Sequence, residues 1–89
     1  MELIVKGSFY RDIHSFTDKN LLRDVFEVII EIEQAQSIAE IHNLKKLKLY
    51  KTHYRIKVAE VYRIGIVIRT NKVWLVCFGH RSKFYQRFP

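Results

Sequence analysis

The order of apolar and polar positions predicts one strand, two helices and then three strands. Residues 2–6 are mostly apolar and have the length of a short strand. Residues 9–16 carry apolar side chains at helical spacing, and Ser8 is a residue type that caps helix starts. A polar link at 17–20 leads to a longer helix whose apolar stripe is formed by Leu21, Leu22, Val25, Phe26, Ile29, Ile32 and Ala35. So short a link predicts that the two helices form an antiparallel hairpin.

In the second half of the chain the apolar positions alternate with a period of two, which is the period of strands. After a weakly patterned, lysine-rich stretch at 37–52, this alternation begins at His53. Two further strands are predicted at 61–69 and 73–80, separated by candidate turns at Ala59-Glu60 and Thr70-Asn71. The predicted fold is α+β, with the N-terminal strand and the helical hairpin packed on one face of a small antiparallel sheet. Residues 81–89 are expected to form one helical turn.

Length and composition limit the class of protein. The 89 residues are enough for one domain, 1–89, and a hydrophobic content of 48% is enough for a packed core. Cys77 is the single cysteine and lies in an apolar run, so we expect a buried thiol and no internal disulfide. The sequence has no apolar run approaching the ~18 residues of a membrane span and no secretory leader, so we expect a cytoplasmic protein without a membrane partner.

Charge is strongly segregated along the chain. Residues 1–41 hold 4 Lys and Arg against 8 Asp and Glu, a net charge of −4. Residues 42–89 hold 12 Lys and Arg against Glu60 alone, a net charge of +11. A half this basic is typical of a protein that binds a polyanion such as RNA, although an acidic protein partner could use the same surface.

The alternation also assigns the basic residues to a face of the sheet. If Tyr54, Ile56 and Val58 face the helices, then His53, Arg55 and Lys57 lie on the uncovered face. The same argument in the next strand puts Arg63 on that face. Gly65 is expected beside them, where the missing side chain would leave space for a ligand to approach. We therefore predict a row of cations on an open sheet surface.

Four segments of the sequence together resemble the RelE/ParE family of bacterial toxins, in the order and spacing of that family. They are Leu44-Lys45-Lys46-Leu47-Lys48-Leu49-Tyr50-Lys51, Tyr54-Arg55-Ile56-Lys57-Val58, Tyr62-Arg63-Ile64-Gly65 and Gly79-His80-Arg81-Ser82-Lys83-Phe84-Tyr85. The helical hairpin also fits, so the resemblance covers essentially the whole chain. Ala59-Glu60-Val61 replaces a Gly-Asp pair that many members have at this turn.

The resemblance implies a small toxin that is held inactive by an antitoxin, which we expect to be small and acidic. RelE-type members cut messenger RNA on the ribosome, whereas ParE-type members share the fold and act on DNA gyrase. Matching the RelE-type motifs points to Arg55, Lys57, Arg63, Arg81 and Tyr85, with His80 where other members have a lysine or a histidine. We therefore expect catalytic roles for Arg63, His80, Arg81 and Tyr85, and RNA-binding roles for Arg55 and Lys57. His53 on the same face, and Lys48, Lys51 and Lys83 in the basic half, are further candidates for RNA binding. A gyrase-directed toxin, or an inactive member that only binds nucleic acid or a partner, remains the alternative.

The residues themselves favour RNA cleavage without a metal or cofactor. Only Glu60 is acidic after residue 41, so the basic half lacks the carboxylates that a two-metal site needs. Arginine fits phosphoryl oxygens through paired donors, and such preorganised cations stabilise a charged transition state. His80 is the first acid/base candidate because imidazole exchanges protons near neutral pH, or it only positions RNA. Tyr85 is the second, or it stacks on a base.

Overall fold

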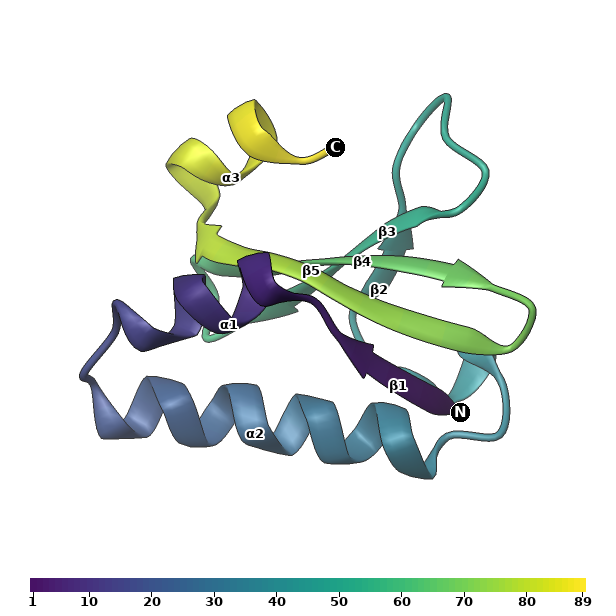
Figure 1. Ribbon diagram of the computed structural model, residues 1–89, viewed down its shortest axis with the longest axis horizontal. Helices are drawn as coiled ribbons and strands as arrows, with labels where there is room; N and C mark the ends of the chain where they lie inside the picture. The colour runs from purple at the N-terminus through teal and green to yellow at the C-terminus, as the bar shows by residue number, and fades with distance from the viewer.

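The computed structural model describes all of residues 1–89, and it confirms the α+β fold class (Figure 1). Two helices follow the first strand and a short third helix follows the last. The elements in chain order are β1 (Glu2–Val5), α1 (Gly7–His14), α2 (Lys19–Gln34), a 3₁₀ turn (Ile38–Glu40), β2 (Leu44–Lys46), β3 (His53–Val58), β4 (Tyr62–Arg69), β5 (Lys72–His80) and α3 (Arg81–Arg87). None of the helices has the length and apolar content needed to span a membrane.

The five strands form one sheet in the order β1-β5-β4-β3-β2. β3, β4 and β5 pair antiparallel as expected, and β2 pairs antiparallel with β3. β1 pairs parallel to β5, so the sheet is mixed and not wholly antiparallel. β1 and β5 are far apart in the sequence, and the long connection between them, which includes α1 and α2, allows the two strands to run in the same direction. β2 was not expected, since it is only three residues long and two of them are lysines. It adds a basic edge strand next to β3.

The main core lies between the helices and one face of the sheet. α2 contributes Leu21, Val25, Ile32 and Ala35, which pack with buried residues of β3, β4 and β5, including Ile56, Ile64 and Leu75. Asp18 caps α2 by accepting hydrogen bonds from the N–H groups of Asn20 and Leu21. Phe26 was expected in the apolar stripe, and this is wrong, because its side chain is 66% exposed.

Both predicted hairpin turns are confirmed. Ala59 and Glu60 have φ angles of 47° and 63°, and Thr70 and Asn71 have φ angles of 46° and 63°. In the two-residue turn Thr70-Asn71, positive φ at both central residues matches the twist of the adjacent strands. Ala59 and Glu60 belong to a three-residue connection that also includes Val61, since Val58 pairs with Tyr62. The first turn therefore forms without glycine, and it sets Lys57 directly opposite Arg63.

An irregularity in β5 gives the sheet a second, smaller core on its opposite face. Gly65 pairs with Cys77 and Ile66 pairs with Leu75, so Val76 is an extra residue in β5. Beyond this bulge Phe78 faces the main core, whereas Cys77 packs with Phe84 and Phe88 of the C-terminal segment. The sheet face predicted to be uncovered is thus partly covered, by α3 (Figure 1). The expected single turn at 81–89 is a seven-residue helix.

Candidate functional site

Three cations lie together on the sheet face that carries α3, as predicted. Arg55 and Lys57 are two positions apart on β3, and Arg63 faces Lys57 from β4. The Arg63 guanidinium is held at the turn, where Nη1 donates hydrogen bonds of 2.9 Å to the carbonyls of Glu60 and Tyr62. Its Nε is buried without a partner, so this guanidinium is not fully satisfied within the protein.

Next to Arg55 the surface forms a hollow of about 210 Å³, and Tyr85 of α3 forms part of its wall. We call it the Tyr85 hollow, and its lining is Lys45, Lys46, Leu47, Lys48, Arg55 and Tyr85. Lys45 is in register with Arg55 across β2 and β3. Tyr85 is 52% exposed, so the phenol is accessible beside a hollow that four basic residues line. Two of these are held by backbone carbonyls, since Lys46 Nζ donates to Tyr50 at 2.8 Å and Arg55 Nη1 donates to Asn43 at 3.3 Å.

Lys45 and Lys46 were not among the predicted site residues, although Lys48, Arg55 and Tyr85 were. The two missed lysines belong to the unexpected strand β2, whose pairing with β3 brings them to the hollow. The density of lysines at 45–51 was the only sequence signal, and it does not distinguish a strand from a solvated loop.

The short helix α3 is fixed to the sheet by two aromatic side chains. Phe84 and Phe88 are buried against Cys77, and their rings are 5.4 Å apart. A Cβ at Gly65 would lie 2.8 Å from both Phe88 Cγ and Cys77 Sγ. The expectation that Gly65 leaves space for a ligand is therefore wrong, because Phe88 fills that space. Gly65 serves to seat α3, which carries Tyr85.

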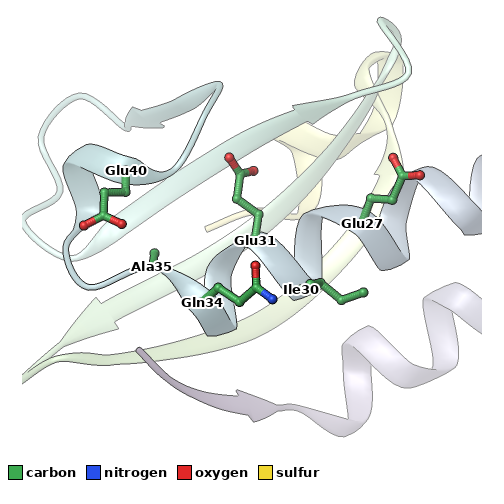
Figure 2. A pocket seen from close by; sticks show the side chains of 6 residues that line it. All are labelled: Glu27, Ile30, Glu31, Gln34, Ala35 and Glu40. Carbon is green, nitrogen blue, oxygen red and sulfur yellow. The ribbon is translucent and has the colours of Figure 1, made fainter.

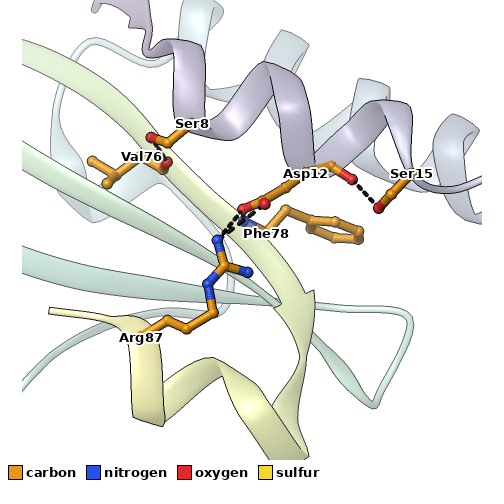
Figure 3. A network of polar contacts seen from close by, with 6 residues as sticks. All are labelled: Ser8, Asp12, Ser15, Val76, Phe78 and Arg87. Atoms are coloured by element: carbon orange, nitrogen blue, oxygen red, sulfur yellow. Dashed lines mark hydrogen bonds and ion pairs between the residues drawn. The ribbon is translucent and has the colours of Figure 1, made fainter.

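A polar network joins α3 to α1 and to the edge of β5 (Figure 3). The Asp12 carboxylate accepts hydrogen bonds of 2.9 and 3.0 Å from Arg87 Nη2 and one of 2.9 Å from the Phe78 N–H. Ser8 Oγ donates to the Val76 carbonyl. The expectation that Ser8 caps α1 is wrong, because Ser8 lies inside the helix and Lys6 is at the N-cap position. Beyond the end of β1, Ser8 and Asp12 of α1 thus form hydrogen bonds with backbone groups on the edge of β5 that β1 does not reach.

His80 and Arg81 lie at the start of α3 and do not line the Tyr85 hollow. His80 caps the helix, since its Nδ1 accepts a hydrogen bond of 3.1 Å from the Ser82 N–H and lies 2.9 Å from Ser82 Oγ. The His80 ring also meets the Tyr62 ring edge-on at 5.5 Å. The Arg81 side chain is exposed, and only its backbone N–H is engaged, by the Val61 carbonyl at 2.7 Å.

The remaining predicted RNA-binding residues differ in their surroundings. The His53 ring is half-buried and packs against Tyr50 and Phe88, with centroids 5.3 and 5.5 Å away. Lys57 Nζ is 3.9 Å from Glu60, which is mostly exposed and so holds it weakly. Lys51 and Lys83 are exposed and make no ion pair. These lysines remain free to contact a polyanion.

Cys77 is buried, as predicted. Burial raises the pKa of its thiol from 9.0 to about 11, although Arg87 nearby opposes part of the rise. The thiol therefore stays protonated at neutral pH and is a packing residue rather than a nucleophile.

The largest hollow of the molecule lies on the acidic side, away from these cations. It measures about 410 Å³ and is lined by Glu27, Ile30, Glu31, Gln34, Ala35 and Glu40, from α2 and the segment after it (Figure 2). Glu31 also contacts His42. Its carboxylates repel phosphate, so RNA is not its ligand. No group of three or more His, Cys, Asp or Glu side chains is arranged to hold a metal ion.

Comparison with solved structures shows which known proteins share the fold of this chain. The chain is similar to RelE in the RelB–RelE antitoxin–toxin complex from Methanococcus jannaschii, with a TM-score of 0.78 and 25% identity over 97% of this chain and 99% of that chain. No protein-family model and no curated protein matches it.

Two further structures share the fold at lower identity. The YoeB dimer from Staphylococcus aureus gives a TM-score of 0.69 and 16% identity, over 86% of this chain and 92% of that chain. YafQ from E. coli strain BL21(DE3) gives a TM-score of 0.65 and 12% identity, over 94% of this chain and 97% of that chain. Since both chains of each pair are matched nearly in full, the whole architecture is shared.

Proposed function

Because this chain has the RelE-type toxin fold, we propose that it is the toxin of a type II toxin–antitoxin pair, an endoribonuclease that cleaves messenger RNA and stops translation. The observation that carries this proposal is the Tyr85 hollow, where a phenol lies among Lys45, Lys46, Lys48 and Arg55. Cations with planar or flexible donors bind phosphate, and the neighbouring phenol supplies an oxygen that can accept or donate a proton.

The cleaved phosphate binds in the Tyr85 hollow, where Arg55 and the lysines offset its charge. Tyr85, which must be a phenolate for this step, accepts the proton of the 2′-hydroxyl as that oxygen attacks phosphorus. The bond to the 5′-oxygen breaks, and negative charge on the five-coordinate phosphorus is stabilised by the surrounding cations. The flanking phosphates are held by Lys57, Arg63 and Arg81. Lys57 and Arg63 face each other two positions beyond Arg55, on the same face of the sheet.

His80, beyond the edge of the hollow that it does not line, donates the proton to the leaving 5′-oxygen in this scheme, and it does so as the imidazolium. Nε2 carries the proton that is transferred, and Nδ1–H donates to Ser82 Oγ, 2.9 Å away, in place of accepting from the Ser82 N–H. In the neutral form the cap fixes the ring at the start of α3. The products are a 2′,3′-cyclic phosphate and a 5′-hydroxyl, and every proton has a donor or acceptor in the protein without a metal ion.

The partner in this proposal is a small acidic antitoxin that covers the basic face. The similar RelE chain was solved with the antitoxin RelB, and residues 42–89 of this chain carry a net charge of +11. Charge of this kind speeds association and is screened by salt, whereas apolar contacts hold the complex. Charge reversal at Arg55 and Arg63 should slow association and flatten its salt dependence. Unchanged association would place the antitoxin elsewhere.

Induction of the chain in growing cells, followed by mapping of RNA 5′ ends, tests the activity. We expect new ends inside translated reading frames, together with arrested translation and unchanged DNA supercoiling. A Tyr85→Phe chain expressed at the same level is the matched control and should give few new ends. Accumulation of cleaved gyrase–DNA complexes without new RNA ends would support the gyrase-directed alternative and reject the ribonuclease.

The chemistry is tested with purified protein. Single-turnover cleavage of RNA should persist in excess EDTA, in a substrate and ribosome preparation that tolerates it, and should leave 2′,3′-cyclic phosphate or 3′-phosphate ends. Replacing the 2′-hydroxyl at the cut site by hydrogen should abolish cleavage, because the nucleophile is lost. Products with 3′-hydroxyl ends would contradict this mechanism.

A further inference from the structure

The face that carries α3 has a second hollow at the opposite end of the sheet. It measures about 100 Å³ and is lined by Lys6, Val67, Arg69, Trp74 and Val76. The Arg69 guanidinium carbon lies 5.0 Å from the centroid of the Trp74 ring, so the two planar groups interact. We call Lys6, Arg69 and Trp74 the Trp74 platform. The proposed cleavage mechanism uses none of these residues.

The Trp74 platform lies on the same face as the Tyr85 hollow but is separated from it. Val67 and Trp74 are in register across β4 and β5, on the face that holds Gly65. Arg55 of the Tyr85 hollow pairs with Gly65 on β4, and Arg69 is four residues further along that strand, about 13 Å at the usual rise of a strand. Phe88, seated on Gly65, lies between them. A ligand that reaches both must therefore be extended.

The cations of the platform are not neutralised by the protein. The three ion pairs of the structure join other residues, so Lys6 and Arg69 are both unpaired. Both are exposed. Glu2, the one acidic residue beside them in the strand register, is opposite Lys72. This end of the face therefore presents free positive charge around an aromatic side chain.

Planar stacking groups beside free cations suit single-stranded nucleic acid better than an acidic peptide. An unstacked base binds on aromatic rings or on guanidinium planes, and the cations contact the neighbouring phosphates. Carboxylates of a peptide would use the charges but would leave the stacking surface unused. The indole also holds the guanidinium in one orientation, which reduces the entropy lost when a base stacks on it.

We propose that the Trp74 platform binds a second nucleotide of the same RNA strand, a few nucleotides from the phosphate in the Tyr85 hollow. A base stacks on the Arg69 guanidinium, which lies over the Trp74 ring, and Lys6 contacts a phosphate. This proposal rests on the proposed function only for the identity of the strand. Binding at the platform can be measured without cleavage.

Trp74 is the only tryptophan of the chain, so its fluorescence reports on the platform directly. We would titrate the protein with non-cleavable 2′-O-methyl oligoribonucleotides of about four and about twelve nucleotides, lengths that fill one or both sites. The longer one should quench Trp74 and bind roughly tenfold more tightly than the shorter one. In Lys6→Gln/Arg69→Gln the gain from length should disappear, and the slope of log affinity against log salt should fall by about 0.7 for the phosphate contact of Lys6 that is lost.

A double variant of equal charge, Lys19→Gln/Arg23→Gln on exposed positions of α2, is the control and should retain the length effect. Wild-type affinity and salt slope in Lys6→Gln/Arg69→Gln would overturn the proposal. So would a polyglutamate peptide that quenches Trp74 as strongly and competes with the long oligonucleotide, since that result favours an acidic protein. If the length effect is present but no RNA is cut, the platform stands and the ribonuclease proposal fails.

Discussion

Asp12 on α1 accepts two hydrogen bonds from Arg87 at the end of α3, with N–O distances of 2.9 and 3.0 Å. The same carboxylate accepts the Phe78 N–H from β5, so one side chain ties a helix, a strand and the C-terminal helix together (Figure 3). Tyr85 is carried by that C-terminal helix. The geometry of the Tyr85 hollow therefore depends on a residue that is far from it in sequence.

Asp12→Ala should lower the free energy of unfolding by about 1–3 kcal/mol, because the Phe78 N–H loses its acceptor in a part-buried position. Asp12→Asn should cost less, since its amide oxygen can still accept that hydrogen bond. Urea unfolding of the two variants measures the difference, with Arg11→Gln on the exposed side of α1 as control. Equal stability of wild type and Asp12→Ala would show that this network does not stabilise the fold.

Gly65→Ala should displace α3 and reduce RNA cleavage. The added Cβ would lie 2.8 Å from Phe88 and Cys77, and overpacking of this kind costs about 1–3 kcal/mol. Phe88→Ala in the same chain should remove the part of the added penalty that comes from Phe88 and leave the part from Cys77, which a double-mutant cycle detects. Gly79→Ala is the matched control, because its Cβ would meet nothing closer than 3.9 Å. Additive effects of the Gly65 and Phe88 changes would contradict the seating of α3 on Gly65.

Tyr85→Phe and Arg55→Gln should each lower the single-turnover cleavage rate by about 10²–10³. Tyr85→Phe keeps the ring, so RNA affinity should change little, whereas Arg55→Gln should also weaken binding. Both side chains are at least partly exposed, so neither change should alter thermal stability appreciably. Wild-type cleavage by Tyr85→Phe would assign Tyr85 to base stacking and leave proton transfer to another group.

Stability should fall at alkaline pH through Cys77. Its thiol has a pKa of about 11 in the folded protein, against an ordinary value of 9.0. The folded chain thus keeps a proton that the unfolded chain has lost, and stability decreases as pH rises through this interval. Unfolding free energies of wild type and Cys77→Ala between about pH 8 and about pH 11 isolate the effect, because other groups titrate in both proteins. A constant difference between the two proteins would contradict the burial of this thiol.

Local alternation was enough to predict β3, β4, both turns and the shared face of Arg55, Lys57 and Arg63. These features depend on residues close in sequence. Phe26 was misassigned because its position in the α2 stripe is as apolar as its neighbours, and only the shape of the sheet decides which residues it covers. The place of α3 was not predictable, because it depends on Asp12, which is separated from Arg87 by seventy-five positions.

The sequence therefore predicted which basic residues lie on this face, but not which of them line the same hollow. Lys48, Arg55 and Tyr85 do meet in one hollow. His80 and Arg81 lie apart from it, since the first turn of α3 directs them elsewhere. Lys45 and Lys46 join it only through β2, which is too short and too polar for its pattern to indicate a strand.

The extra residue, Val76, changes which side chains of β5 face α2. Before it, odd-numbered residues such as Val73 and Leu75 face the α2 side; after it, the even-numbered Phe78 does. If β5 alternated strictly past Leu75 with its sequence unchanged, Phe78 and Cys77 would exchange faces, and a phenylalanine would point at the seat of Phe88. Loss of the bulge without loss of a residue would thus take away the attachment of α3 while leaving every residue of the Tyr85 hollow unchanged.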